Sequence, residues 1–178
     1  MLEDNRAWGV ISAIEVNPLI TKSIDIFGYT SITTTKNLVY YVIIQGKVFA
    51  TRVEATTDTS NIDSSHSTTT TITNYFYTDG TESFEQDPSS GGYILRDTLG
   101  NTYTVSSEYV KDNKVFAGLI TKTSGYSETA GADSFGNPFN IYTDNLYQII
   151  KGRAVVDKSI TLTEATNPDT SKVYTLSI

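Results

Sequence analysis

The sequence predicts an all-β protein, an antiparallel β-sandwich or barrel with two long loops, built as one domain over residues 1–178. Three observations predict this fold. About ten short apolar or Thr-rich segments alternate with turn residues at regular spacing, which is typical of sandwiches and barrels. Helical patterns do not alternate with the strands, which argues against a parallel sheet. Cys is absent, so a disulfide scaffold is excluded.

The first two predicted strands follow from apolar residues at period 2. Apolar side chains share one face over residues 8–16, and this strand is expected to end or bend at Asn17-Pro18, because proline cannot donate to a central ladder. A second strand is expected over residues 19–27, where isoleucines recur in phase.

The next segments predict a hairpin and the first long loop. Residues 38–44 are apolar on both faces, which predicts a central strand covered on both sides. Gln45-Gly46 is expected to turn the chain, with Gly in the left-handed region, and residues 47–53 return. The Ser/Thr/Asp/Asn-rich stretch 55–67 predicts a long loop. Residues 68–77 predict a strand with one hydroxyl face, because Thr is β-branched.

Turn signals place the remaining hairpins. Asp79-Gly80 predicts a turn, and the Asp-Pro-Ser-Ser-Gly-Gly stretch at 87–92 predicts a further loop. Short apolar segments on both sides of residues 97–101 and of residues 111–114 predict two hairpins. The last strands are expected over residues 145–150, 153–156, 160–163 and 173–178, with Asn167-Pro168-Asp169 as a turn.

Residues 124–138 predict the second long loop. Three aromatic residues lie in or beside it among small residues. Aromatic rings in a long loop either pack back on their own domain or dock on a partner, and the sequence leaves both open. The interaction candidates are the rings Tyr126, Phe135 and Phe139 and the hydroxyl residues Thr69, Thr71 and Thr73.

Two segments, 41–47 and 147–153, share the pattern Tyr-x-Ile-Ile-x-Gly followed by a basic residue. Duplication would explain this recurrence, and so would two hairpins that meet the same physical demands. Thr143–Lys151 can be interpreted as a helix with Thr143 as its N-cap, or as part of a hairpin. We favour the hairpin, because the matching segment 41–47 lies among β-branched residues.

No catalytic residue, metal site or cofactor is predicted. Without Cys, thiolate zinc sites and cysteine catalysis are excluded. The single histidine, His66, lies between two serines in an expected loop, with no sign of a buried catalytic base. Residues 58–63 have alternate oxygen ligands as in a calcium loop but lack its central Gly and closing Glu, so a polar loop is the simpler interpretation. Phosphate-binding and nucleophile-elbow motifs are also missing.

Charge and hydropathy limit the expected partners. The net charge of −7 repels phosphates, so direct nucleic-acid binding is not expected. The simpler interpretation of this charge is that it keeps the protein soluble. A narrower one is that it lines a conduit, whose surface nucleic acid slides past without binding. No apolar run reaches the roughly 20 residues that span a bilayer, so membrane insertion is not expected. The N-terminus lacks the basic and apolar regions of a signal peptide, so we expect synthesis in a host cytoplasm.

In style, the whole chain resembles the structural proteins of tailed-bacteriophage virions. The acid-bearing N-terminus, the Thr-rich run 68–73, hairpins such as that of residues 93–105 and the lack of Cys carry this resemblance. It implies a virion protein whose partners are copies of itself and other virion structural proteins. Capsid decoration, tail tube or neck, and fibre or baseplate subunit are the roles it would allow.

Two other functions stay open. A carbohydrate-binding or adhesion module would need a sugar-stacking surface, although Tyr is also a common strand and interface residue. A glycan-processing enzyme would need two carboxylates across a cleft, and no pair among the 20 acidic residues stands out. We therefore expect a non-enzymatic structural protein. The residues that would form a stacking surface are Tyr75, Phe76, Tyr77, Tyr93 and Tyr103.

Overall fold

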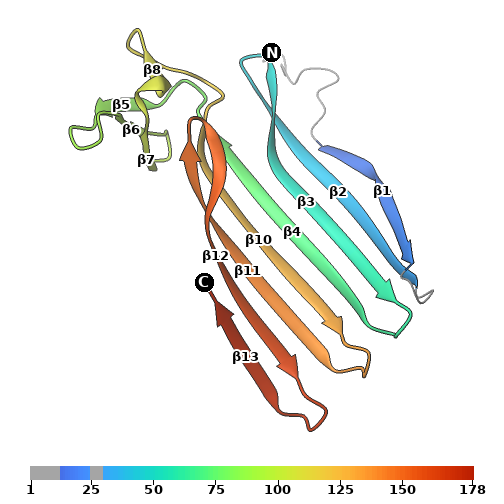
Figure 1. Cartoon of the computed structure of the whole chain (residues 1–178). Coiled ribbons are helices and arrows are strands. Elements are labelled where there is room, and N and C mark those ends of the chain that lie inside the picture. Colours follow the sequence, from blue (N-terminus) through green and yellow to red (C-terminus); the bar gives the residue numbers. More distant parts are fainter. Residues whose placement is uncertain (1–12, 25–29) are drawn as a thin grey trace.

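The computed structural model describes residues 13–24 and 30–178, and the prediction of an all-β, antiparallel fold is confirmed there. Eight strands lie side by side in one sheet (Figure 1), each paired antiparallel with its neighbours. In spatial order they are β1 (Ala13–Ile24), β2 (Thr30–Ile44), β3 (Lys47–Asn61), β4 (His66–Tyr77), β10 (Ile120–Ala132), β11 (Pro138–Ile150), β12 (Arg153–Thr166) and β13 (Lys172–Ser177).

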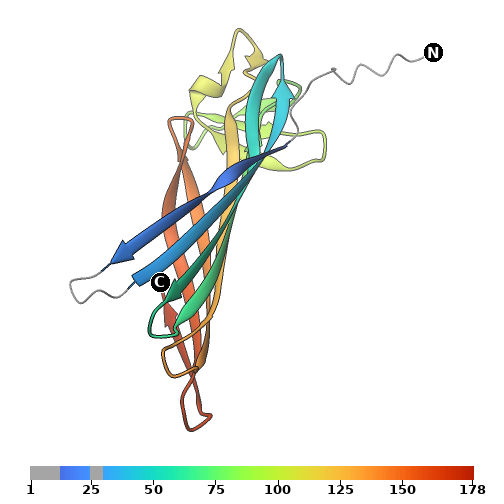
Figure 2. The ribbon, with the colours of Figure 1, turned by 90° about the vertical axis from the view of Figure 1, so that its right-hand side faces the viewer.

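This main sheet is open and one layer thick. It is not closed into a barrel, and no second sheet of its size faces it within residues 13–24 and 30–178. Figure 2 shows β1 and β2 inclined to β11 and β12, as sheet twist requires. Among the described residues of the eight strands, only Ile72, Thr123 and Gly125 are buried. The main sheet therefore has no core of its own on either face.

Residues 78–119, called the insertion below, leave the main sheet between β4 and β10. They fold into a small unit at the end of the sheet where β4 stops (Figure 1). Its core consists of Leu95, Val105, Tyr109 and Val115. The elements are the three-stranded sheet β5 (Ser83–Gln86), β6 (Tyr93–Arg96) and β7 (Thr102–Val105), a 3-10 turn (Ser107–Tyr109), and the pair β8 (Val110–Lys111) and β9 (Lys114–Val115).

Hydrogen bonds close the base of the insertion on itself and tie it to β10. Thr78, fully buried, donates its backbone N–H to the carbonyl of Leu119 at 2.9 Å and accepts from the N–H of Gly118 at 2.7 Å. The hydroxyl of Tyr109 donates to the carbonyl of Ile120, the first residue of β10, at 2.5 Å. The insertion therefore has a fixed position at the end of the sheet.

The predicted tight turns are confirmed where turn residues separate apolar segments. Gln45 and Gly46 both have positive φ, 50° and 76°, which is the two-residue turn that matches strand twist. Asp112 and Asn113, with φ of 51° and 58°, turn β8 into β9 in the same way. The helical interpretation of Thr143–Lys151 is wrong, because this segment is β11 and its turn.

Both predicted long loops are wrong. Residues 55–67 continue β3 to Asn61, turn over four residues and begin β4 at His66. Residues 124–138 are most of β10, a short turn and the start of β11. Hydroxyl and small residues, which usually mark loops, here occupy regular paired positions. The long excursion of the chain is the insertion instead.

The expectation that residues 38–44 form a central strand covered on both sides is also wrong. These residues belong to β2, the second strand from one edge of the sheet. Val42 and Ile43 point to opposite faces, and they are 37% and 41% exposed. Burial within this chain therefore does not account for the apolar residues at these positions.

The two strands expected over residues 8–16 and 19–27 lie partly outside the described residues. Their described parts form a single strand, β1, which runs through Pro18. The pairing of β1 with β2 shifts by one residue between Val16 and Leu19, as in a β-bulge. This edge position is where a sheet tolerates proline.

Candidate functional site

The two faces of the main sheet differ in charge. On one face, called the uncharged face, the paired positions of all eight strands carry no charged side chain in the described residues. Charged residues such as Lys36, Glu54, Glu128 and Asp144 alternate onto the other, charged face. One row across the uncharged face reads Leu19, Thr35, Thr57, Thr69, Thr129, Ile141, Thr163 and Thr175.

Threonine hydroxyls on the uncharged face bond to one another between strands. The Oγ1 atoms of Thr69 and Thr129, on β4 and β10, are 2.8 Å apart. Further pairs at 3.0–3.4 Å are Thr143 with Thr161, Thr35 with Thr57, and Thr33 with Thr59. Because these hydroxyls already have partners, covering this face with another protein surface would leave few of them unsatisfied.

Two glycines on β10 make room for aromatic rings on the uncharged face. A side chain at Gly131 would overlap the ring of Phe139 on β11, and one at Gly125 would come within 2.9 Å of the Tyr147 hydroxyl. These rings lie across the glycine backbone of the neighbouring strand. Phe139 therefore packs back on its own sheet.

The six interaction candidates do not form one site. Thr69, Thr71 and Thr73 follow one another along β4 on the uncharged face, where Phe139 also lies. Tyr126 lies on the charged face. Phe135 lies in the turn between β10 and β11 and is 86% exposed.

Tyr126 belongs to a patch of half-exposed apolar residues on the charged face of β10–β13, called the apolar patch below. Tyr142, Leu162 and Leu176 form one row across it. Tyr126 and Ile160 lie in the next row, on either side of Asp144. A shallow hollow of about 310 Å³ lies between the side chains of this patch. Residue-type patterning did not reveal it, because Tyr126 was predicted to lie in a loop.

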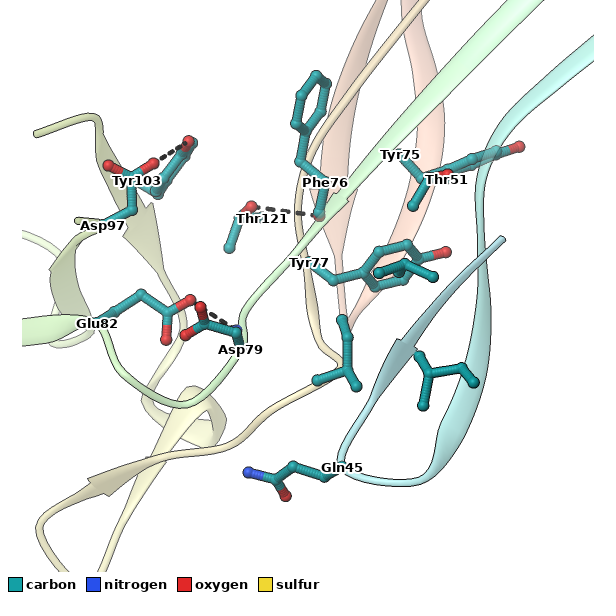
Figure 3. A pocket seen from close by; sticks show the side chains of 13 residues that line it. Gln45, Thr51, Tyr75, Phe76, Tyr77, Asp79, Glu82, Asp97, Tyr103 and Thr121 are labelled. Atoms are coloured by element: carbon teal, nitrogen blue, oxygen red, sulfur yellow. Dashed lines mark hydrogen bonds between the residues drawn. The ribbon is translucent and has the colours of Figure 1, made fainter. Parts of the chain in front are cut away.

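A second hollow, of about 520 Å³, lies between the insertion and the end of the main sheet (Figure 3). The main sheet contributes Tyr75, Phe76 and Tyr77, and the insertion contributes Tyr103. Four of the five predicted stacking residues therefore lie around this pocket, with Tyr75 and Tyr77 on one face of β4 and Phe76 on the other. The fifth, Tyr93, packs edge-to-face against Phe84 in the insertion, with ring centroids 5.7 Å apart.

The carboxylates beside this pocket hold turns. Glu82 accepts the backbone N–H groups of Asp79 and Gly80 at 2.8 and 3.0 Å. Asp97 accepts from Asn101 and, at 3.1 Å, from the Tyr103 hydroxyl (Figure 3), and these bonds lower the pKa of Asp97. Burial, together with this bond to Asp97, raises the pKa of Tyr103. The hydrogen bonds of Glu82 and Asp97 therefore stabilise turns, and this role requires no substrate.

The two weaker sequence candidates lie at the β3–β4 turn and at the start of β4. His66, the first residue of β4, is exposed. Asp63 accepts the N–H of Ser65 at 3.0 Å and its hydroxyl at 2.6 Å, which lowers the pKa of Asp63. No cluster of three or more metal-ligating side chains occurs in the part of the chain that the structure describes. Nor do those residues include a helix long and apolar enough to span a membrane.

Comparison with known proteins adds no relative. No protein-family model matches the chain, and the searches of curated proteins and of solved structures return no match. The function must therefore be argued from the sheet, the apolar patch and the pocket.

Proposed function

We propose that this chain is a non-enzymatic structural subunit of a virion, and that it assembles with copies of itself and with other virion proteins through its main sheet. The observation that supports this proposal is the single-layer sheet. Its described strands bury three residues, whereas a domain of this size ordinarily buries most of its large apolar side chains. Assembly would supply the missing cover.

The exposed apolar residues lie where a neighbouring subunit would cover them. Tyr126, Tyr142 and Leu162 are each more than 40% exposed, and all three belong to the apolar patch. The uncharged face, with its paired hydroxyls, is a second surface of low desolvation cost. Both surfaces fit broad protein–protein contact better than capture of a small molecule.

Size-exclusion chromatography with light scattering tests this proposal. The unmodified chain should elute as an oligomer, and electron microscopy of the native particle should locate the subunit. Leu162→Asp, in the apolar patch, should weaken assembly, whereas Leu99→Asp, at an 87% exposed position in the insertion, should not. A stable monomer at all concentrations would contradict the proposal, and so would equal effects of the two variants.

Carbohydrate binding is the second candidate, and the pocket in Figure 3 favours it. Aromatic rings beside hydroxyl and carboxylate groups are a combination that suits sugar stacking. Binding on a glycan array should be lost in Tyr77→Ala and retained in Phe135→Ala, whose ring lies outside the pocket. No binding by the unmodified chain would remove this candidate.

A further inference from the structure

The strands β2, β3 and β4 recur as β11, β12 and β13 at a constant spacing of 106 residues. The strand pairing is the same in both sets. Tyr40 pairs with Arg52 as Leu146 pairs with Lys158. In both sets one residue of the returning strand then bulges, so that Tyr41 pairs with Ala50 and Tyr147 with Val156.

The turns of the two sets also agree. Gln45 and Gly46 have φ of 50° and 76°, and Lys151 and Gly152 have φ of 49° and 70°. At the other end of the sheet, the turns of residues 61–65 and 167–171 have the same hydrogen bonds. In each turn, Asn Nδ2 donates to Ser Oγ at 2.9 Å, and that Ser donates its N–H and its hydroxyl to Asp at 3.0 and 2.6 Å.

Sequence identity between the two sets is concentrated at the turns and the residues next to them. A matching turn alone can recur in unrelated hairpins, but a bulge and two turns that all recur at one constant spacing of 106 residues favour duplication. The identical pairs are Tyr41 and Tyr147, Ile43 and Ile149, Ile44 and Ile150, Gly46 and Gly152, Thr57 and Thr163, Asn61 and Asn167, Asp63 and Asp169, Ser65 and Ser171, Thr69 and Thr175, and Ile72 and Ile178.

The fourth strand of each set occupies the equivalent place. Leu19 of β1 pairs with Thr35 of β2, and Thr129 of β10 pairs with Ile141 of β11, the residue equivalent to Thr35. The main sheet is therefore two copies of one four-stranded unit, β1–β4 and β10–β13. Pairing between β4 and β10 joins them. Of the two explanations for the recurrent sequence pattern, duplication is the one that the structure supports.

This repeat defines how the edges of the sheet can pair. β13 is equivalent to β4, and β1 is equivalent to β10. Unlike β4 and β10, which pair with each other, β13 and β1 lie at the two edges of the sheet, without a second neighbour in the described part of the chain. We propose that β13 of one copy pairs antiparallel with β1 of a second copy, in the register of the β4–β10 junction. Thr175 then lies opposite Leu19, as Thr69 lies opposite Thr129, and Tyr174 lies opposite Ile20, as Thr68 lies opposite Ala130.

The side chains at both edges suit this pairing. Leu19 and Ile20 are 65% and 66% exposed, and Tyr174 is 61% exposed. Soluble proteins usually protect sheet edges with Lys and Pro, and these edges carry Lys22, Lys172 and Pro18 but also present large apolar groups. In the proposed register Leu19 and Thr175 continue the uncharged face from one copy to the next, and Ile20 and Tyr174 continue the charged face.

Two local features limit the contact without preventing it. Lys22 would lie opposite Lys172, but the Lys172 ammonium is 2.7 Å from the Glu164 carboxylate, which offsets its charge. Pro18, which lies at the bulge in the β1–β2 pairing, would lie opposite Leu176 and cannot donate a hydrogen bond to β13. Because β13 is six residues long, in this register it lies opposite Lys22 to Asn17, and the contact consists of β13 and the segment of β1 on the C-terminal side of the bulge.

The absence of Cys makes disulfide trapping a direct test. Two single variants, Leu19→Cys and Thr175→Cys, are mixed as separately purified chains and oxidised. Opposed residues of paired strands lie at distances that a disulfide spans, so the mixture should give a covalent dimer. The double variant Thr69→Cys/Thr129→Cys is the positive control, because it places the same pair at the β4–β10 junction within one chain. The negative control is Leu19→Cys mixed with Tyr174→Cys, whose side chains would point to opposite faces.

Because this inference rests on assembly of the chain, light scattering is run on the same samples. A cross-linked dimer from the Leu19/Thr175 mixture and none from the negative control supports edge pairing. An oligomer by light scattering with no such dimer overturns edge pairing and leaves the proposed function standing. A monomer in every sample overturns both. If the double variant Leu19→Cys/Thr175→Cys cross-links only within one chain, the sheet closes on itself and edge pairing between copies is wrong.

Discussion

Replacing Gly118 by Ala tests how the insertion rests on the main sheet. Gly118 has φ of +84°, and a methyl group there would overlap the ring of Phe49 on β3, with Cε1 at 3.0 Å. Gly136 is a matched control, because it has φ of +82° and nothing within 4 Å of the added methyl. Both changes cost the strain of a left-handed alanine, about 1–2 kcal/mol. Only Gly118→Ala adds the cost of overpacking, about 1–3 kcal/mol.

Thermal unfolding followed by far-UV circular dichroism measures this difference. For a chain of this size, each 1 kcal/mol lowers the melting temperature by about 2–4 °C. Gly118→Ala should therefore melt about 2–12 °C below Gly136→Ala at equal protein concentration. The double variant Phe49→Ala/Gly118→Ala should lose less stability than the sum of the losses of the two single variants, because the added methyl group no longer overlaps the ring. Equal melting of Gly118→Ala and Gly136→Ala would refute the contact between the insertion and β3.

Three other predictions follow from buried or hydrogen-bonded groups. Thr123→Val should raise the free energy of unfolding by about 1 kcal/mol in urea titrations, because the buried Thr123 hydroxyl has no partner among the described residues; a loss of stability would mean that the hydroxyl is satisfied. Leu95→Ala should destabilise the insertion by about 2–5 kcal/mol, since Leu95 is fully buried, and limited proteolysis should then cut residues 78–119 first. The pKa of Asp87 is lowered to about 2 by bonds from Ser89 and Ser90, so its stabilising effect is complete above the ordinary pKa of about 4 and is lost as the pH falls towards 2. Asp87→Asn should flatten that part of the acid-unfolding curve, and an unchanged curve would contradict the assignment.

The sequence predicted the fold class and the turns well, because turn chemistry is local. Asp97-Thr-Leu-Gly-Asn101 predicted its hairpin, and in the structure Asp97 accepts the N–H groups of Leu99 and Asn101. Asp133-Ser-Phe-Gly-Asn137 has the same pattern and the same bonds from Phe135 and Asn137. The second pentapeptide would have revealed the β10–β11 hairpin. It was missed because the flanking strands are rich in small and hydroxyl residues.

The prediction of strand positions was wrong where it depended on the apolar pattern that burial normally produces. Alternation of apolar and polar residues identifies a strand that covers a core, and the main sheet covers none within its own chain. Residues 55–61 and 124–132 therefore had the composition of loops, although backbone pairing makes them strands. For residues 38–44 the error is the opposite one. Their apolar pattern predicted a strand covered on both faces, but Val42 and Ile43 are partly exposed on opposite faces.

The duplication was hard to see in the sequence for a related reason. Within each four-stranded unit, the identities cluster at turns that require particular residues, such as Gly46 and Gly152 at positive φ. Between the turns, exposed strand positions tolerate many β-forming residues, so identity is sparse there. The recurrent Tyr-x-Ile-Ile-x-Gly segments are the most similar part of a repeat in which β2, β3 and the first half of β4 correspond to β11, β12 and β13.

The position of the insertion is related to the same repeat. It lies where the first four-stranded unit joins the second, between β4 and β10. If copies pair through β13 and β1, the equivalent junction joins two separate chains, and residues 78–119 of neither copy lie there. Insertions would then occur once in every eight strands, all at the same end of a continuous sheet. A continuous sheet built this way would carry twice as many four-stranded units as insertions, and electron microscopy of the assembled particle would count both directly.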